Sequence, residues 1–110
     1  MERELRAQVW CRLIGELESL MSGHRGITEA SRIISALRFD LEEESNALFL
    51  PFVGIDSETD TFPLGHVRDR WQPAALAALD VRRSELEAIY RPAAFEAAEK
   101  LLVYARAHAL

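Results

Sequence analysis

Apolar residues recur with a helical period over the first twenty residues of the chain. Leu5, Val9, Leu13 and Leu17 follow one another at four-residue intervals, which places their side chains on one face of an α-helix. Gly23, in the sequence SGHRG, can adopt the left-handed conformation that ends many helices. The pattern predicts an amphipathic first helix that ends at this glycine.

A second helical pattern follows after a short connection. Thr28 is a good N-cap residue, and Ala30, Ile33 and Leu37 repeat on one face. We therefore expect a second helix over about residues 28–39. The short connection favours an antiparallel pair of helices.

The last third of the chain predicts a short helical turn, HVRDRW, and then one or two longer helices. Pro73 suits the first turn of a helix, and apolar residues from Leu76 onward continue the pattern to the chain end. Pro92 either kinks a single long helix or separates two. Ala-rich and Glu-rich sequence without glycine on both sides favours the single helix, and the alternative stays open.

Residues 46–65, NALFLPFVGIDSETDTFPLG, show no helical period. Two prolines and two glycines stand among apolar side chains, which predicts a long ordered loop held against the helices by Phe and Leu. A short strand over residues 52–55 is an alternative for part of it, but one strand without a partner makes no sheet. We therefore expect one all-α domain, residues 1–110, built as an antiparallel bundle of three to four helices with a long ordered acidic loop.

The net charge of −5 is unevenly distributed along the chain. Residues 39–62 contain seven Asp and Glu and neither Lys nor Arg, so they carry −7 and the remainder carries +2. Nucleic-acid binding needs a basic surface, so we expect no direct nucleic-acid partner. No apolar run approaches the length of a membrane span and no secretory signal pattern is visible. We therefore expect a cytoplasmic protein that does not enter a membrane.

Three acids at alternate positions, Asp56, Glu58 and Asp60, suggest metal ligands. FVGIDSETDT resembles the opening D-x-E motif of the DnaQ-like exonucleases, but the chain offers neither the sheet nor the further acids of that family. A calcium loop fails because Thr61 and Val67 stand where Gly and Glu are required. The three histidines lie at no ligand spacing. We expect no enzyme, no catalytic residue, no metal and no cofactor; a metal-dependent hydrolase using Asp56 and Glu58 stays as an alternative.

The acidic window can instead attract a basic protein surface and speed the encounter with it. Trp71 stands beside arginines in RDRWQP, and Trp and Arg are enriched where proteins grip their partners. In another interpretation, Arg68 and Arg70 pair with the loop acids and hold the loop in place. The candidate partner-binding residues are Asp56, Glu58, Asp60, Glu42, Glu43, Glu44, Trp71 and Arg68.

The segments SALRFDLEEE, LPFVGIDSETDTFPLGHVR and EAAEKLL, with Trp71 and Asp80 between the last two, resemble a family of small uncharacterised bacterial proteins. The resemblance covers nearly the whole chain from the second helix onward, and PFVGIDSETDTFPLG with Trp71 is its most specific part. It implies a compact bacterial protein of the immunity type, and it transfers no catalytic residues.

Together these observations lead us to expect a small bacterial protein-binding module. It would be an immunity or antitoxin-like inhibitor that occludes a basic partner, such as a toxin, through its acidic loop. A homodimeric structural protein, whose exposed helical face is its own partner, stays as an alternative.

Overall fold

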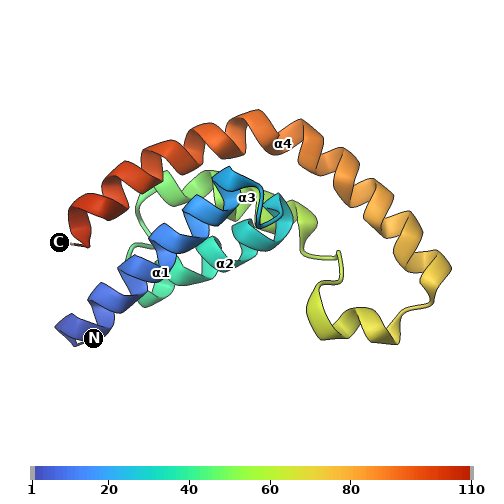
Figure 1. Ribbon diagram of the computed structural model, residues 1–110, viewed down its shortest axis with the longest axis horizontal. Helices are drawn as coiled ribbons and strands as arrows, with labels where there is room; N and C mark the ends of the chain where they lie inside the picture. The colour runs from blue at the N-terminus through green and yellow to red at the C-terminus, as the bar shows by residue number, and fades with distance from the viewer. Residues whose placement is uncertain (1, 110) are drawn as a thin grey trace.

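The computed structural model describes residues 2–109 and contains helices without any strand in that range (Figure 1). The prediction of an all-α fold is confirmed. The elements are α1 (Arg3–Ser22), α2 (Ile27–Asp40), the 3-10 helix η1 (Ala47–Phe49), α3 (Leu50–Thr59), the 3-10 helix η2 (Gly65–Arg70) and α4 (Pro73–His108).

The first two helices form the expected antiparallel pair (Figure 1). α1 ends at Gly23, which adopts φ 83° and donates its N–H to the Leu20 carbonyl. The prediction that Thr28 is the N-cap of α2 is wrong, because Gly26 takes that position. The Thr28 N–H instead donates to the Glu87 carboxylate of α4 at 2.9 Å. A carboxylate from a distant helix thus satisfies an N-terminal amide and complements the helix dipole.

The predicted long ordered acidic loop, and its alternative strand over residues 52–55, are both wrong. η1 and α3 occupy this segment, and Pro51 stands in the first turn of α3, where its missing N–H costs nothing. Phe52, Ile55 and Thr59 are buried at the i, i+3, i+7 spacing of a helix. That period is hidden in the sequence because Leu50, which is 55% exposed, lies among equally apolar neighbours.

α4 is one continuous helix, as the composition around Pro92 favours. At 1.5 Å per residue its 36 residues extend about 54 Å along the helix, which exceeds the 47 Å longest dimension of the molecule. The helix therefore bends, and it arches over the other elements (Figure 1). Pro92 is exposed, so the carbonyl of Ala88 that loses its hydrogen bond lies on the solvent side, where water can solvate it.

The hydrophobic core lies between α1, α2, α3 and the C-terminal half of α4. Leu13, Leu17, Phe49 and Phe52 are its largest fully buried side chains. From α4 it receives mostly small residues, which allow the long helix to pack closely on its neighbours: Ala94, Ala97, Ala98, Leu101, Leu102 and Ala105. Within residues 2–109, no helix is both long enough and apolar enough to cross a lipid bilayer.

Candidate protein-binding surface

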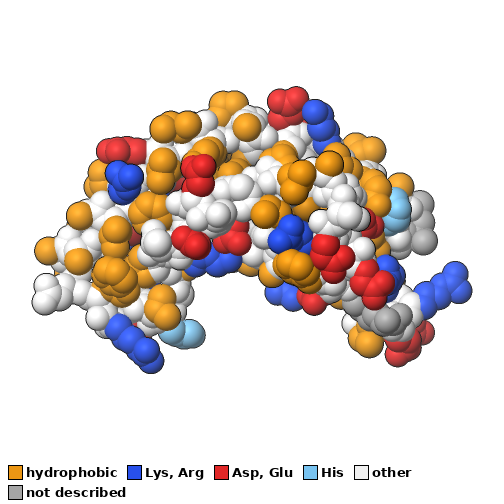
Figure 2. Space-filling model, turned by 180° about the vertical axis from the view of Figure 1, so that it is seen from behind, with side chains coloured by type: hydrophobic (Ala, Val, Ile, Leu, Met, Phe, Trp, Pro, Cys, Tyr) orange, Lys and Arg blue, Asp and Glu red, His pale blue; other side chains and the backbone are white. Residues whose placement is uncertain are grey.

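Residues 64–93 form an arm that stands away from the core. The arm consists of η2, the short link after it and the N-terminal half of α4, and none of its residues is buried. A space-filling view shows the arched outline of the molecule, with a hollow between the arm and the helix bundle (Figure 2). The arm therefore adds much surface to the protein, and it joins the bundle near its C-terminal end, where Tyr90 packs against the core.

Two parallel hydrogen bonds fix η2 to α4 within the arm. The two terminal guanidinium nitrogens of Arg68, Nη1 and Nη2, each donate to one oxygen of the Asp80 carboxylate at 2.8 Å, and Arg83 approaches the same carboxylate at 3.6 Å. The hydrogen bond from Arg68 lowers the pKa of Asp80, and it raises the pKa of Arg68 itself. Bidentate pairing gives direction as well as attraction, so it defines how η2 lies against the helix.

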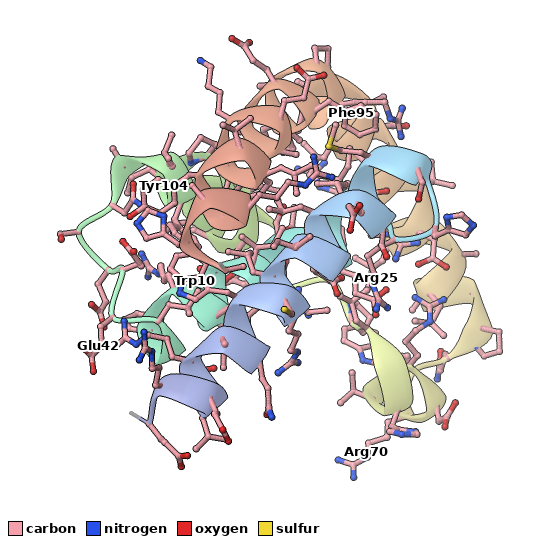
Figure 3. The ribbon with its side chains drawn as sticks, turned by 60° about the vertical axis from the view of Figure 1, so that its left-hand side comes forward. Trp10, Arg25, Glu42, Arg70, Phe95 and Tyr104 are labelled. Atoms are coloured by element: carbon pink, nitrogen blue, oxygen red, sulfur yellow. The ribbon has the colours of Figure 1, made fainter. Side chains whose placement is uncertain are left out.

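The far end of the arm carries the tip, defined here as Val67, Arg70 and Trp71. Val67 is 49% exposed and Trp71 is 43% exposed. Arg70 points away from the molecule (Figure 3), and it makes no ion pair with any residue that the structure describes. A large aromatic side chain beside a free guanidinium is a typical anchor for a protein partner.

The helical conformation of α3 sends its acids in different directions. Asp56 faces α2, where it pairs with Arg32 at 3.5 Å. Glu58 faces α4, where it accepts a hydrogen bond from Tyr90. Asp60 is exposed at the C-cap of α3 and has no partner within residues 2–109. Residues two apart on a helix do not share a face, so the structure does not bring these three carboxylates together.

Arg32 explains how the C-terminus of α3 is held. Its guanidinium donates to the carbonyl of Thr59 at 2.9 Å and approaches that of Phe62 at 3.4 Å, in addition to its contact with Asp56. A cation at a helix C-terminus satisfies unpaired carbonyls and complements the dipole. Asp56 therefore belongs to an internal network rather than to a free acidic face.

The three acids that follow α2, Glu42, Glu43 and Glu44, also differ in their contacts. Glu42 adopts φ 57° and pairs with Arg6 at 3.2 Å. Glu43 accepts a hydrogen bond from Tyr104 at 2.9 Å and another from Asn46. Glu44 is exposed and unpaired within the described part of the chain. Of the candidate acids, only Glu44 and Asp60 keep carboxylates free of side-chain partners.

The two remaining candidates, Trp71 and Arg68, both lie in the arm. Trp71 lies on the surface, unlike the second tryptophan of the chain, Trp10, which is 3% exposed and belongs to the core. The interpretation that Arg68 pairs with the acids of residues 46–65 is wrong, because its partner is Asp80 on α4. That pairing could not be read from the sequence, since Asp80 lies outside the acidic window.

An aromatic cluster that the sequence analysis missed, formed by Trp10, Tyr104 and His108, lies at the end of the bundle. Tyr104 stacks on His108 with 4.0 Å between ring centroids, and the ring centroids of Trp10 and His108 are 5.2 Å apart. Burial and the hydrogen bond to Glu43 raise the pKa of Tyr104. The i, i+4 spacing of Tyr104 and His108 was the only available signal.

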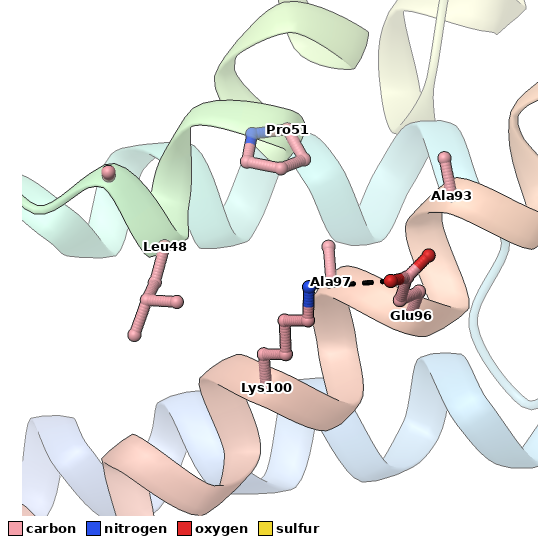
Figure 4. A pocket seen from close by; sticks show the side chains of 7 residues that line it. Leu48, Pro51, Ala93, Glu96, Ala97 and Lys100 are labelled. Atoms are coloured by element: carbon pink, nitrogen blue, oxygen red, sulfur yellow. Dashed lines mark ion pairs between the residues drawn. The ribbon is translucent and has the colours of Figure 1, made fainter.

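A pocket of about 340 Å³ opens between η1, the start of α3 and α4 (Figure 4). Apolar side chains, including Leu48 and Pro51, form its walls, and Lys100 pairs with Glu96 across its rim at 3.3 Å. Because its two charged groups neutralise each other, the pocket presents no unpaired group that would orient a substrate.

The described residues contain no group of three or more His, Cys, Asp or Glu that could hold a metal ion. Asp56 and Glu58, the pair named for a metal-dependent hydrolase, contact different helices and do not face a common point. The protein was also compared with other proteins. No family model, no curated protein and no solved structure matches the chain.

Proposed function

We propose that the protein is a non-catalytic protein-binding module that holds its partner through the tip of the arm. The exposure of Trp71 carries this proposal, since an indole that is 43% exposed on an arm without buried residues contributes little to folding. Val67 extends the apolar contact and Arg70 supplies an unpaired charge. A binding hot spot usually consists of aromatic, apolar and arginine side chains like these, surrounded by polar residues.

The charge of residues 39–62 supports a partner with a basic surface. Asp60 ends α3 where the chain leaves the bundle for the arm, and Glu44 is free on the other side of η1. The narrower proposal is an immunity or antitoxin-like inhibitor that occludes a basic toxin. In that case the tip excludes water at the contact, and the free carboxylates pair with Lys or Arg of the toxin.

A photo-crosslinking residue in place of Trp71 tests the proposal in the producing cells. The captured protein is then purified, and its affinity is measured calorimetrically for wild type and for Trp71→Ala. We expect at least about a thirtyfold loss of affinity for Trp71→Ala, which corresponds to the roughly 2 kcal/mol that defines a hot spot. Phe39→Ala is the matched control, because Phe39 is 54% exposed but lies at the end of α2.

The charge component has its own readout. Asp60→Lys should weaken binding at low salt and reduce its dependence on ionic strength, because exposed charges are screened by salt. An unchanged affinity in Trp71→Ala would overturn the assignment of the tip. Unchanged salt dependence in Asp60→Lys would overturn the basic partner.

A further inference from the structure

The solvent side of the arm carries an apolar face that no part of the described chain covers. We call it the outer stripe, and its members follow the i, i+3, i+4, i+7 spacing along α4, on the side opposite to the half-buried Leu76, Leu79 and Leu86. Val81 is 60% exposed and Ile89 is 71% exposed. The stripe consists of Ala74, Ala77, Ala78, Val81, Glu85, Ala88 and Ile89, all exposed.

The surface of the protein is larger than its mass requires. The accessible area is 6792 Å², whereas a compact monomer of this mass exposes about 6,200 Å². The radius of gyration is 14.7 Å, compared with about 13 Å for a compact domain of this length. The excess of about 600 Å² agrees with an arm that extends from the bundle and leaves its outer face uncovered.

Two unpaired and complementary charges lie here on α4, Arg82 beside the stripe and Glu85 within it. Arg82 and Glu85 are both exposed, and neither forms an ion pair or a side-chain hydrogen bond with the rest of the described chain. Arg82 and Glu85 lie about one turn apart on α4. If two copies of this helix packed in parallel and in register, each charge would face the like charge of the other copy and repel it. Two antiparallel helices can bring Arg82 of each opposite Glu85 of the other.

We propose that the outer stripe is a self-association surface, on which two copies of the chain pack their α4 helices antiparallel about a two-fold axis. The axis passes between residues 83 and 84, and two Arg82–Glu85 pairs flank it. A two-fold interface must be self-complementary, with each contact occurring twice, and this stripe meets that condition. The stripe does not include the tip, so the second copy and the proposed partner occupy different surfaces.

The apolar residues fit the same register. Ala78 and Ile89 lie at equal distances on either side of the axis. Ile89 of one copy therefore faces Ala78 of the other copy, so that a large side chain meets a small one. A shallow depression lies at the centre of the contact, and it is lined by Asp80, Val81, Ser84, Glu85 and Ala88. Small residues allow two helix backbones to approach closely.

Charge reversal tests the register directly. In Arg82→Glu, and separately in Glu85→Arg, the axis is flanked by like charges, so each variant alone should associate at least about tenfold more weakly than wild type at low salt. An equimolar mixture of the two variants should form a heterodimer, because every pair is then attractive. The double variant should recover wild-type association. Sedimentation velocity over a concentration series measures all four cases.

Arg12→Glu serves as the control, since Arg12 is exposed on α1 and has no ion-pair partner within residues 2–109. Val81→Glu should abolish association whatever the register. Circular dichroism checks that each variant is folded. The proposal is overturned if wild type sediments as a monomer at submillimolar concentration, or if the mixed variants do not associate while wild type does.

Discussion

Arg68 in η2 and Asp80 in α4 are joined by two parallel hydrogen bonds of 2.8 Å. This contact links the two segments of an arm that has no buried residue. With few apolar contacts available there, a bidentate ion pair defines the position of η2. It also places the tip, because Trp71 follows η2 directly.

Arg68→Lys should loosen η2, because an ammonium group keeps the charge but cannot form two parallel hydrogen bonds. We expect faster amide hydrogen exchange over residues 65–72, while exchange in α1 stays unchanged. Arg106→Lys is the control, since Arg106 contacts Glu18 through an exposed and longer pair of 3.3 Å. Equal protection of η2 in wild type and Arg68→Lys would show that other contacts hold the arm.

The same contact should respond to acid. Arg68 holds the pKa of Asp80 below its ordinary value of 3.8, so the pair is fully formed above that pH and is lost as the pH falls through the lower folded value. The protection that this pair gives residues 65–72 against exchange should therefore stay constant from neutral pH down to about 4 and decrease at lower pH. Asp80→Asn should make the acid-induced loosening disappear, because no carboxylate remains to be protonated.

The helical state of α3 can be tested with glycine substitutions. Gly54 lies within the helix, and a methyl group built there meets no other atom within 4 Å. Gly54→Ala should raise the free energy of unfolding by about 0.5–1 kcal/mol. Gly23→Ala should lower it by about 1–2 kcal/mol, because Gly23 has φ 83°. Urea denaturation measures both, and a destabilising Gly54→Ala would contradict the helix.

Packing of α3 on the core predicts a difference between two of its apolar side chains. Phe52 is 0% exposed, so Phe52→Ala should cost about 3–5 kcal/mol of stability through lost burial and a cavity. Leu50 is 55% exposed, and Leu50→Ala should change stability by less than about 0.5 kcal/mol. Similar losses at the two positions, measured by chemical unfolding, would be inconsistent with this orientation of α3.

The aromatic cluster predicts a late phenol titration. Burial and the Glu43 carboxylate raise the pKa of Tyr104 above 10, so the neutral phenol favours the folded state. Its contribution is complete below the ordinary pKa and is lost as the pH rises through the folded value. Ultraviolet absorbance against pH should show a late transition that is missing in Tyr104→Phe. Glu43→Gln should move that transition toward lower pH.

The sequence predicts the long helices well because their buried faces alternate with polar ones. It fails at α3 because Leu50 is as apolar as the buried Phe52, so the helical period is not visible. The candidate site depended on that error, since acids at alternate positions share a face in a strand and separate in a helix. Contacts between distant elements, such as Arg68 with Asp80 or Thr28 with Glu87, have no signal in a single sequence.

The absence of buried residues in the arm has a consequence for mutational tolerance. A scan of all substitutions that is selected only for folding should show a tolerant block over residues 64–93, apart from helix-breaking changes in α4 and changes at Glu87 and Tyr90, which contact the bundle. The same scan selected for activity in the cell should show intolerant positions within this block, at the tip and along the outer stripe. The proposed binding surfaces lie on the arm and the core lies outside it, so one experiment with two selections can test whether folding and binding depend on different parts of the chain.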